Sequence, residues 1–115
     1  MLKKQAVPAL LLLLASACIP NTALDRGAIR SAIEASVSVE GAPITIKRIV
    51  ISGDYALGIF DQGGQQNDIL LARRGRRWSM MLCATAPIRD RGELLRAGVP
   101  WFAAEMLAKQ VAEPE

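Results

Sequence analysis

Cys18 is the residue whose surroundings predict a chemical modification most directly. It follows Met-Leu-Lys-Lys, an apolar stretch that includes residues 10–14, and the small residues Ala15-Ser16-Ala17. A positively charged start, a short apolar segment and small residues before a cleavage point are typical of an export signal. We therefore predict a lipoprotein signal peptide over residues 1–17 and an acyl anchor, of the palmitate type, on the thiol of Cys18.

Other interpretations of this segment stay open. An ordinary signal peptidase would accept the Ala15-x-Ala17 pattern, and Ala15 stands where a lipoprotein signal prefers Leu. Cys18 would then be an ordinary cysteine, free to pair with Cys83 in an oxidising compartment. In that case the chain is a soluble periplasmic or secreted protein.

The apolar stretch does not predict a transmembrane helix, which needs about 20 apolar residues; here it is short and contains Pro8. Ile19, and not an Asp that would retain a lipoprotein in the inner membrane, follows Cys18. If Cys18 is acylated, we therefore expect the protein to be anchored in the outer membrane and to face the periplasm.

Sulfur-bearing side chains gather in Met80-Met81-Leu82-Cys83. Residues i and i+2 of a strand project to the same face, so Met81 and Cys83 are candidate soft ligands for Cu(I). Met106 or a free Cys18 is a candidate third ligand. Two alternatives compete: methionine fills core gaps and free cysteine is usually buried, or Cys83 forms a disulfide with Cys18.

Arg73, Arg74, Arg76 and Arg77 surround Gly75 and are the one concentration of positive charge. An arginine-rich tip can contact anionic lipid headgroups or another anionic surface, each charge contributing about 1 kcal/mol. The alternative is a hairpin end that the arginines keep in water.

Several kinds of catalysis are excluded because the chain contains no histidine. Serine and cysteine triads, histidine-based zinc sites and imidazole pH switches all need one, and two cysteines are too few for a structural zinc site. Gly63-Gly64 lacks the Gly-Lys-Ser/Thr pattern of a phosphate loop. The aspartates stand at expected turns and caps, where Asp is favoured for local hydrogen bonds. We therefore predict a non-enzymatic protein without catalytic residues.

Length and charge indicate one nearly neutral domain. Removing residues 1–17 leaves 98 residues, enough for a single core. The same removal takes away Lys3 and Lys4 and lowers the formal net charge from +3 to +1. A nearly neutral domain is not typical of nucleic-acid binding.

Hydrophobic periodicity predicts the elements that position these residues. Thr22 caps a helix whose apolar stripe ends near Val37. Four strands follow, the first over residues 44–51. Its alternation changes phase, which predicts either a bulge near Lys47-Arg48 or a strand whose two faces are both partly covered. The others are expected over residues 55–60, 69–74 and 76–84, with a polar loop or wide hairpin end over residues 61–68.

The C-terminal part predicts two helices. Asp90 caps a short helix through Arg96, with Leu94 and Leu95 facing the core, and Pro100 begins the last helix, in which Trp101 joins the core. The fold class is therefore α+β: a helix, a four-stranded antiparallel meander with helices on one face, and two C-terminal helices, with cystatin-like or NTF2-like domains as analogies. The predicted organisation is an anchor and short linker over 18–21, one domain over 22–112 and a frayed end over 113–115.

Residues 53–100 resemble small exported bacterial proteins known as copper uptake system-associated proteins. The resemblance lies in Gly53-Asp54-Tyr55-Ala56, Gln62-Gly63, Leu70-Leu71 with Arg73-Arg74, Trp78, Leu82-Cys83, and Ala97-Gly98-Val99-Pro100. Asn67-Asp68 stands where that family tends to have a small residue. The resemblance implies a copper-handling context, with Cys83 as a family position and an envelope protein of a copper uptake system as partner; it implies no catalytic residues.

Together these observations predict an envelope lipoprotein that is an accessory or binding protein. One hypothesis is a Cu(I)-binding accessory to copper uptake; without that metal, no cofactor is expected. The other is a metal-free module that binds a protein or the membrane.

Overall fold

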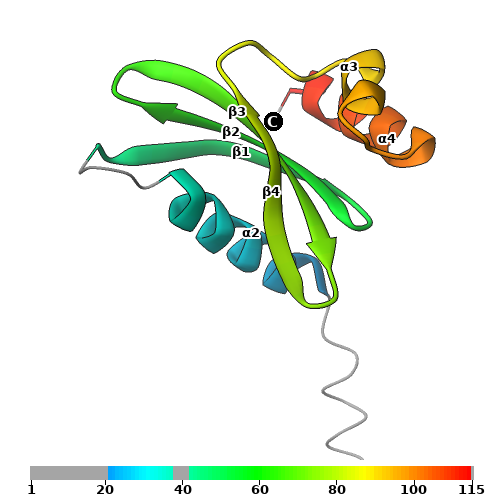
Figure 1. The fold of residues 1–115 in the computed structure, drawn as a ribbon, viewed down its shortest axis with the longest axis horizontal. Helices are drawn as coiled ribbons and strands as arrows, with labels where there is room; N and C mark the ends of the chain where they lie inside the picture. The colour runs from blue at the N-terminus through cyan, green and yellow to red at the C-terminus, as the bar shows by residue number, and fades with distance from the viewer. Residues whose placement is uncertain (1–20, 38–41, 115) are drawn as a thin grey trace, which may run out of the picture.

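The computed structural model describes residues 21–37 and 42–114, with the side chains of residues 21–23 left aside. Helix α2 (Asn21–Val37) precedes a four-stranded sheet, which is followed by helices α3 (Arg91–Arg96) and α4 (Trp101–Ala112). The strands are β1 (Ile44–Ser52), β2 (Tyr55–Gln62), β3 (Gln65–Arg74) and β4 (Arg77–Ala84), paired antiparallel in the order β1-β2-β3-β4 (Figure 1). This confirms the predicted α+β class and the meander.

Tight turns join the strands. Gly63 and Gly64 both have positive φ, 58° and 82°, and form a two-residue turn because Gln62 pairs with Gln65. Two consecutive residues in this conformation are typical of hairpin turns that match the twist of the strands. The wide loop predicted over residues 61–68 is therefore wrong, because β2 and β3 extend through the polar residues on either side of the turn.

A bulge in β1 confirms the predicted change of phase. The register between β1 and β2 shifts between Ile46 and Arg48, so Lys47 is the extra residue. An extra residue reverses the face to which the following side chains point. Ile49 therefore faces the same side of the sheet as Ile46, although the two are three positions apart.

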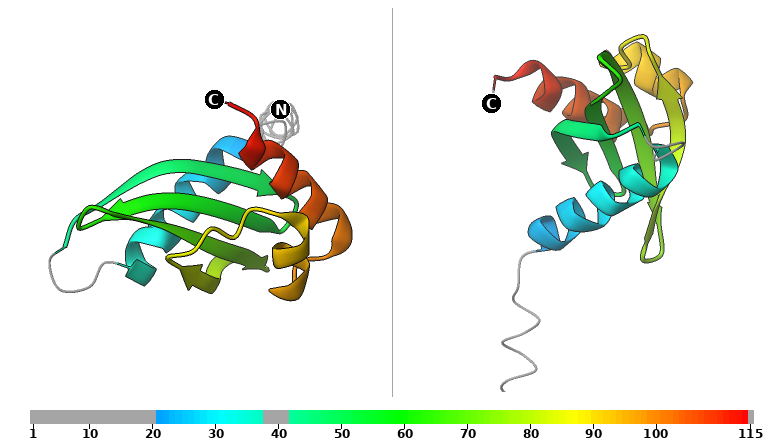
Figure 2. Two further views of the ribbon diagram at one scale, coloured as in Figure 1. Left: turned by 90° about the horizontal axis from the view of Figure 1, so that it is seen from above. Right: turned by 90° about the vertical axis from the view of Figure 1, so that its left-hand side faces the viewer.

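The sheet has a separate hydrophobic core on each face. Alternate residues of β3 divide between them: Ile69 and Leu71 pack on the α2 side, whereas Leu70 packs with α3 and α4. Figure 2 shows α2 on one side of the sheet and α4 on the other. The expectation of helices on one face is therefore wrong; burying both faces explains why the central strands have continuous apolar runs.

Close packing of α2 depends on a glycine in β2. A Cβ atom on Gly58 would lie 2.8 Å from Cδ1 of Ile33 and 3.1 Å from Cγ2 of Ile69. The absent side chain lets the helix approach the sheet, and Ile29 and Ile33 become fully buried.

The C-terminal helices begin and end as predicted, but two of the side chains assigned to the core are outside it. Asp90 caps α3 by accepting a hydrogen bond from the backbone N–H of Glu93 at 2.7 Å, and Gly98 follows the helix with a φ of 109°. Leu94 is fully buried, whereas Leu95 is exposed. Trp101 is 54% exposed and packs under the guanidinium of Arg91, 5.4 Å from the ring centre.

Candidate functional site

The predicted anchor residue, Cys18, lies outside the described residues, and with it the alternative of a Cys18–Cys83 disulfide. The structure does place Cys83, near the end of β4. Its side chain is exposed, and its thiol forms no disulfide with any of the described residues. The alternative in which Cys83 is buried in the core is wrong.

A second bulge separates the two predicted copper ligands. Leu71 pairs with Met80 and Leu70 with Leu82, which makes Met81 the extra residue of β4. Met81 packs with the core on the α3 and α4 side, while Cys83 pairs with Ile69, whose side chain faces α2. The i and i+2 argument assumed an unbroken strand; because of the bulge, Met81 and Cys83 lie on opposite faces of the sheet.

The electrostatic setting of Cys83 favours the protonated thiol. Partial desolvation, and secondly the negative charge of Asp68, raise the pKa of Cys83 above its ordinary value. Metal ligation and nucleophilic attack both need the thiolate. Among residues 21–37 and 42–114, no three His, Cys, Asp or Glu side chains gather in a way that could hold a metal ion.

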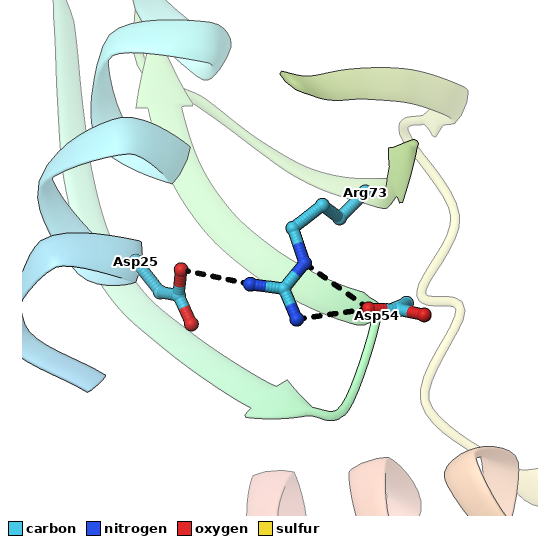
Figure 3. A network of polar contacts seen from close by, with 3 residues as sticks. All are labelled: Asp25, Asp54 and Arg73. Atoms are coloured by element: carbon cyan, nitrogen blue, oxygen red, sulfur yellow. Dashed lines mark hydrogen bonds and ion pairs between the residues drawn. The ribbon is translucent and has the colours of Figure 1, made fainter. Parts of the chain in front are cut away.

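The four arginines of the predicted tip divide into one that is bound within the fold and three that are exposed. Nε and Nη2 of Arg73 donate to Oδ1 of Asp54 at 3.1 and 2.9 Å, and Nη1 donates to Oδ1 of Asp25 at 3.3 Å (Figure 3). Its guanidinium also lies 5.5 Å from the ring centre of Trp78. Arg73 therefore ties α2, the β1–β2 turn and β4 together, and the anionic-surface contact predicted for it is not available while these bonds hold.

Arg74, Arg76 and Arg77 are exposed at the β3–β4 turn, where Gly75 has a φ of 64°. In the part of the chain that the structure describes, none of their side chains has a hydrogen bond or ion pair. They are the residues of the predicted surface that the fold leaves accessible; we call them the arginine tip.

The first edge of the sheet, β1, is covered by side chains from two helices. In the two-residue β1–β2 hairpin the backbone groups of Ile49 and Ile51 point away from β2, by the alternation of an antiparallel ladder. Nη1 of Arg26 donates to the carbonyl of Ile49 at 3.1 Å, and Nε2 of Gln110 donates to the carbonyl of Ile51 at 3.0 Å.

Helix α4 is held to the same edge. Arg48 on β1 donates from Nη1 to the carbonyl of Val111 at 2.9 Å and from Nη2 to that of Gln110 at 2.7 Å. A cation on the last carbonyls of a helix also complements the helix dipole. Between β1, α2 and the end of α4 a cleft of about 500 Å³ remains, lined by four cations and Glu113. These cations are Arg26, Arg30, Lys47 and Arg48.

The cations of that cleft are largely committed to the fold. Arg26 and Arg48 are bonded to backbone carbonyls, and Nζ of Lys47 forms an ion pair with Oδ2 of Asp61 at 2.9 Å. The cleft therefore covers a strand edge, and its charge is in part already compensated.

The opposite edge, β4, differs. By the same alternation, Trp78, Met80 and Cys83 point their backbone groups away from β3. None of the described residues donates a hydrogen bond to these carbonyls. Apolar side chains are exposed on both sides of the strand, Met80 at 45% and Leu82 at 41%.

Beside β4, Asp68 holds the following loop to the sheet. Oδ2 of Asp68 accepts from the backbone N–H of Ile88 and from Nε of Arg89, both at 2.9 Å, and Oδ1 accepts from Nη2 of Arg89 at 2.9 Å. Asp68 is 2% exposed, the one buried charged residue among those described. Sequence reasoning assigned it to a turn; the Asn67-Asp68 departure from the resembled family was the only signal at this position.

No helix in the described part of the chain combines the length and apolar character needed to cross a membrane. Comparison with family models, with curated proteins and with solved structures finds no match for this chain. The resemblance to copper uptake system-associated proteins and the analogy with cystatin-like or NTF2-like domains therefore stay predictions.

Proposed function

We propose that this protein is an exported, lipid-anchored accessory protein that binds an extended segment of a partner polypeptide along β4. The observation that carries the proposal is a difference between the two sheet edges: Arg26 and Gln110 donate to outward carbonyls of β1, whereas none of the described residues donates to those of β4. An uncovered edge is a template for an added strand. In strand addition the backbone hydrogen bonds supply affinity, and alternate side chains supply specificity.

The side chains along β4 indicate which kind of partner segment could pair with this strand. Met80 on the α2 side and Leu82 on the other side offer apolar contacts, so the partner strand would carry apolar residues at alternating positions. From Arg73 to Ala84 the chain has no acidic residue, and the arginine tip lies at one end. Charge complementarity therefore favours an acidic residue opposite Arg77, which begins β4.

A second copy of this chain fits this description less well. In antiparallel pairing of two β4 strands, each tip would lie beside the last residues of the other β4, which have no carboxylate. The proposed partner is therefore a different polypeptide of the cell envelope. A component of a copper uptake system is the candidate that the sequence resemblance supplies.

Backbone substitution tests the proposal because Cys83 presents its N–H outward. Cys83→Pro removes that N–H without removing a β3–β4 ladder bond, whereas Cys83→Ser keeps it. The mature protein, purified with its bound partners from envelope extract, is expected to lose a co-purifying polypeptide with Cys83→Pro and to retain it with Cys83→Ser. Equal retention by both variants would show that strand addition at β4 does not hold the partner.

The anchor has its own test. Intact mass of the protein taken from membranes is expected to include the mass of acyl chains on a chain that begins at Cys18. A free thiol or a disulfide at Cys18 would overturn the lipid-anchored part of the proposal and leave the binding edge to be judged separately.

A further inference from the structure

The start of α2 and the arginine tip lie at the same end of the molecule (Figure 1). One contact of Arg73 joins the two directly, the ion pair with Asp25 of α2 at 3.3 Å. The ion pair with Asp54 and the hydrogen bond from the backbone N–H of Arg73 to the carbonyl of Asp54 at 2.7 Å hold the same end of β3 to the β1–β2 turn. Moving the tip away from the start of α2 would break the ion pair with Asp25.

The position of the anchor residue in the sequence makes this arrangement relevant to a membrane. Cys18 precedes the first helical residue, Asn21, by three positions. Successive Cα atoms are about 3.8 Å apart, so an acylated Cys18 would keep the start of α2 within about 11 Å of the anchored residue. The end of the molecule that contains the tip would then lie at the bilayer surface.

The exposed side chains at this end suit an anionic bilayer. Arg74, Arg76 and Arg77 are exposed, and Leu24 of α2 is 65% exposed beside them. A cleft of about 510 Å³ lies between the two, and its lining includes Leu24, Ala28, Arg73, Gly75, Arg76 and Trp78. The carboxylates at this end, Asp25 and Asp54, are both paired with Arg73, which leaves a net positive charge even after they are counted.

We propose that the arginine tip is a membrane-contact surface that binds anionic lipid headgroups and orients the anchored domain, with Leu24 at the interface. The inference rests on the acyl anchor of the proposed function for its biological setting. A lipid chain combined with a basic patch is a recognised way to make membrane attachment stable. With the tip at the bilayer, the helices α3 and α4 and the end of β4 next to them would face away from it.

Vesicle binding tests the surface separately from the anchor. Both hydrophobic cores lie between Ile29 and Leu107, so the chain from residue 18 contains the whole described fold. That chain, with Cys18→Ser and no acyl group, is mixed with vesicles of phosphatidylcholine containing either 30% phosphatidylglycerol or none. At about 1 kcal/mol per arginine we expect roughly a hundredfold stronger partition onto the anionic vesicles at low salt, declining as salt is raised.

A charge-matched pair of variants isolates the tip. Arg74→Gln, Arg76→Gln and Arg77→Gln together are expected to abolish the preference for anionic vesicles. Arg30→Gln, Arg96→Gln and Lys109→Gln remove the same charge at exposed positions elsewhere and are expected to preserve most of it. Equal loss in both variants, or equal partition onto both kinds of vesicle, would overturn the proposal.

The two proposals fail in distinguishable ways. If the protein is acylated but its tip variant partitions onto anionic vesicles as the control variant does, the anchor is supported and the membrane-contact surface is not. If the protein carries no acyl mass but still prefers anionic vesicles, the membrane-contact surface is supported and the anchor is not.

Discussion

The two edges of the sheet differ in whether side chains of the described residues bond to their outward-pointing carbonyls. β1 presents outward carbonyls at Ile49 and Ile51, and side chains of α2 and α4 donate to both. β4 is of similar length, yet none of the described residues donates to its outward carbonyls, and apolar side chains remain exposed along it. An unprotected edge invites pairing with another chain, and the proposed binding edge is the one that the described residues leave uncovered.

The difference comes from where the helices lie. The end of α4 reaches β1, and Arg48 and Gln110 exchange bonds between that helix and the strand. On the other side of the sheet, α2 buries Trp78 but leaves Met80 exposed. β1 is therefore held by hydrogen bonds from side chains of α2 and α4, while β4 is supported by β3, by α2 around Trp78 and by the loop that Asp68 holds.

The largest expected loss of stability comes from breaking the contact between Asp68 and the loop that follows β4. Asp68→Asn replaces the buried carboxylate that accepts from Ile88 and Arg89 and should lower the free energy of unfolding by about 3 kcal/mol, because hydrogen bonds to a charged acceptor are lost at a buried site. Urea denaturation measures it. The control Asp61→Asn removes a more exposed carboxylate paired with Lys47 and should cost less than about 1 kcal/mol. Equal costs would mean that Asp68 does not hold the loop as described.

Arg73→Ala should have the next largest effect, at the end where β3 and β4 meet α2. It removes hydrogen bonds to Asp25 and Asp54 and the contact with Trp78, and about 1–2 kcal/mol of unfolding free energy should be lost. Arg76→Ala is the matched control and should change stability by no more than about 0.5 kcal/mol. If thermal or urea unfolding gave the same loss of stability for both substitutions, the distinction between Arg73, which is bound within the fold, and the exposed arginine tip would be contradicted.

Uncovering β1 would make the two edges more alike. Gln110→Ala removes the donor to the carbonyl of Ile51 and should cost about 1 kcal/mol. The neighbouring Lys109→Ala, at an exposed position, should be close to neutral. Unfolding experiments on the pair test whether the coverage of β1 stabilises the fold.

The smallest effect concerns the thiol on β4. Desolvation raises the pKa of Cys83 in the folded protein, so the pH midpoint of its alkylation rate should be higher than in the same chain unfolded in urea. As the pH rises, the unfolded chain releases this proton first, and the free energy of unfolding should fall through that range. A midpoint equal to that of the unfolded chain would contradict the desolvation of Cys83, and a lower one would indicate a stabilised thiolate and strengthen the Cu(I) hypothesis.

Much of the fold follows from the sequence, because its signals are local. The bulge near Lys47 is visible as a change of phase among isoleucines, and the cap at Asp90 as an aspartate before a short apolar stripe. The bulge at Met81 left no such signal, since apolar residues occupy every position from Met80 to Cys83. The strand itself was therefore predicted, but the prediction that Met81 and Cys83 lie on the same face of it was wrong.

The parts of the candidate site that sequence could not predict depend on tertiary contacts. Arg73 looks like its three neighbours in the sequence, and only the position of α2 and the β1–β2 turn shows that it is bound within the fold. The coverage of β1 likewise depends on residues far apart in the sequence, 59 positions for Gln110 and Ile51 and 23 for Arg26 and Ile49. Whether a sheet edge is covered depends on where the helices and loops pack, which local sequence patterns do not show.

Site-specific photo-crosslinking in intact cells tests the unequal edges most directly. A photoreactive residue is placed at Met80 on β4 or, as the control, at the exposed Thr45 on β1. The account predicts a discrete adduct with an envelope polypeptide from position 80 and none from position 45. Adducts of equal yield from both positions, or a β4 adduct that contains only a second copy of this chain, would contradict it.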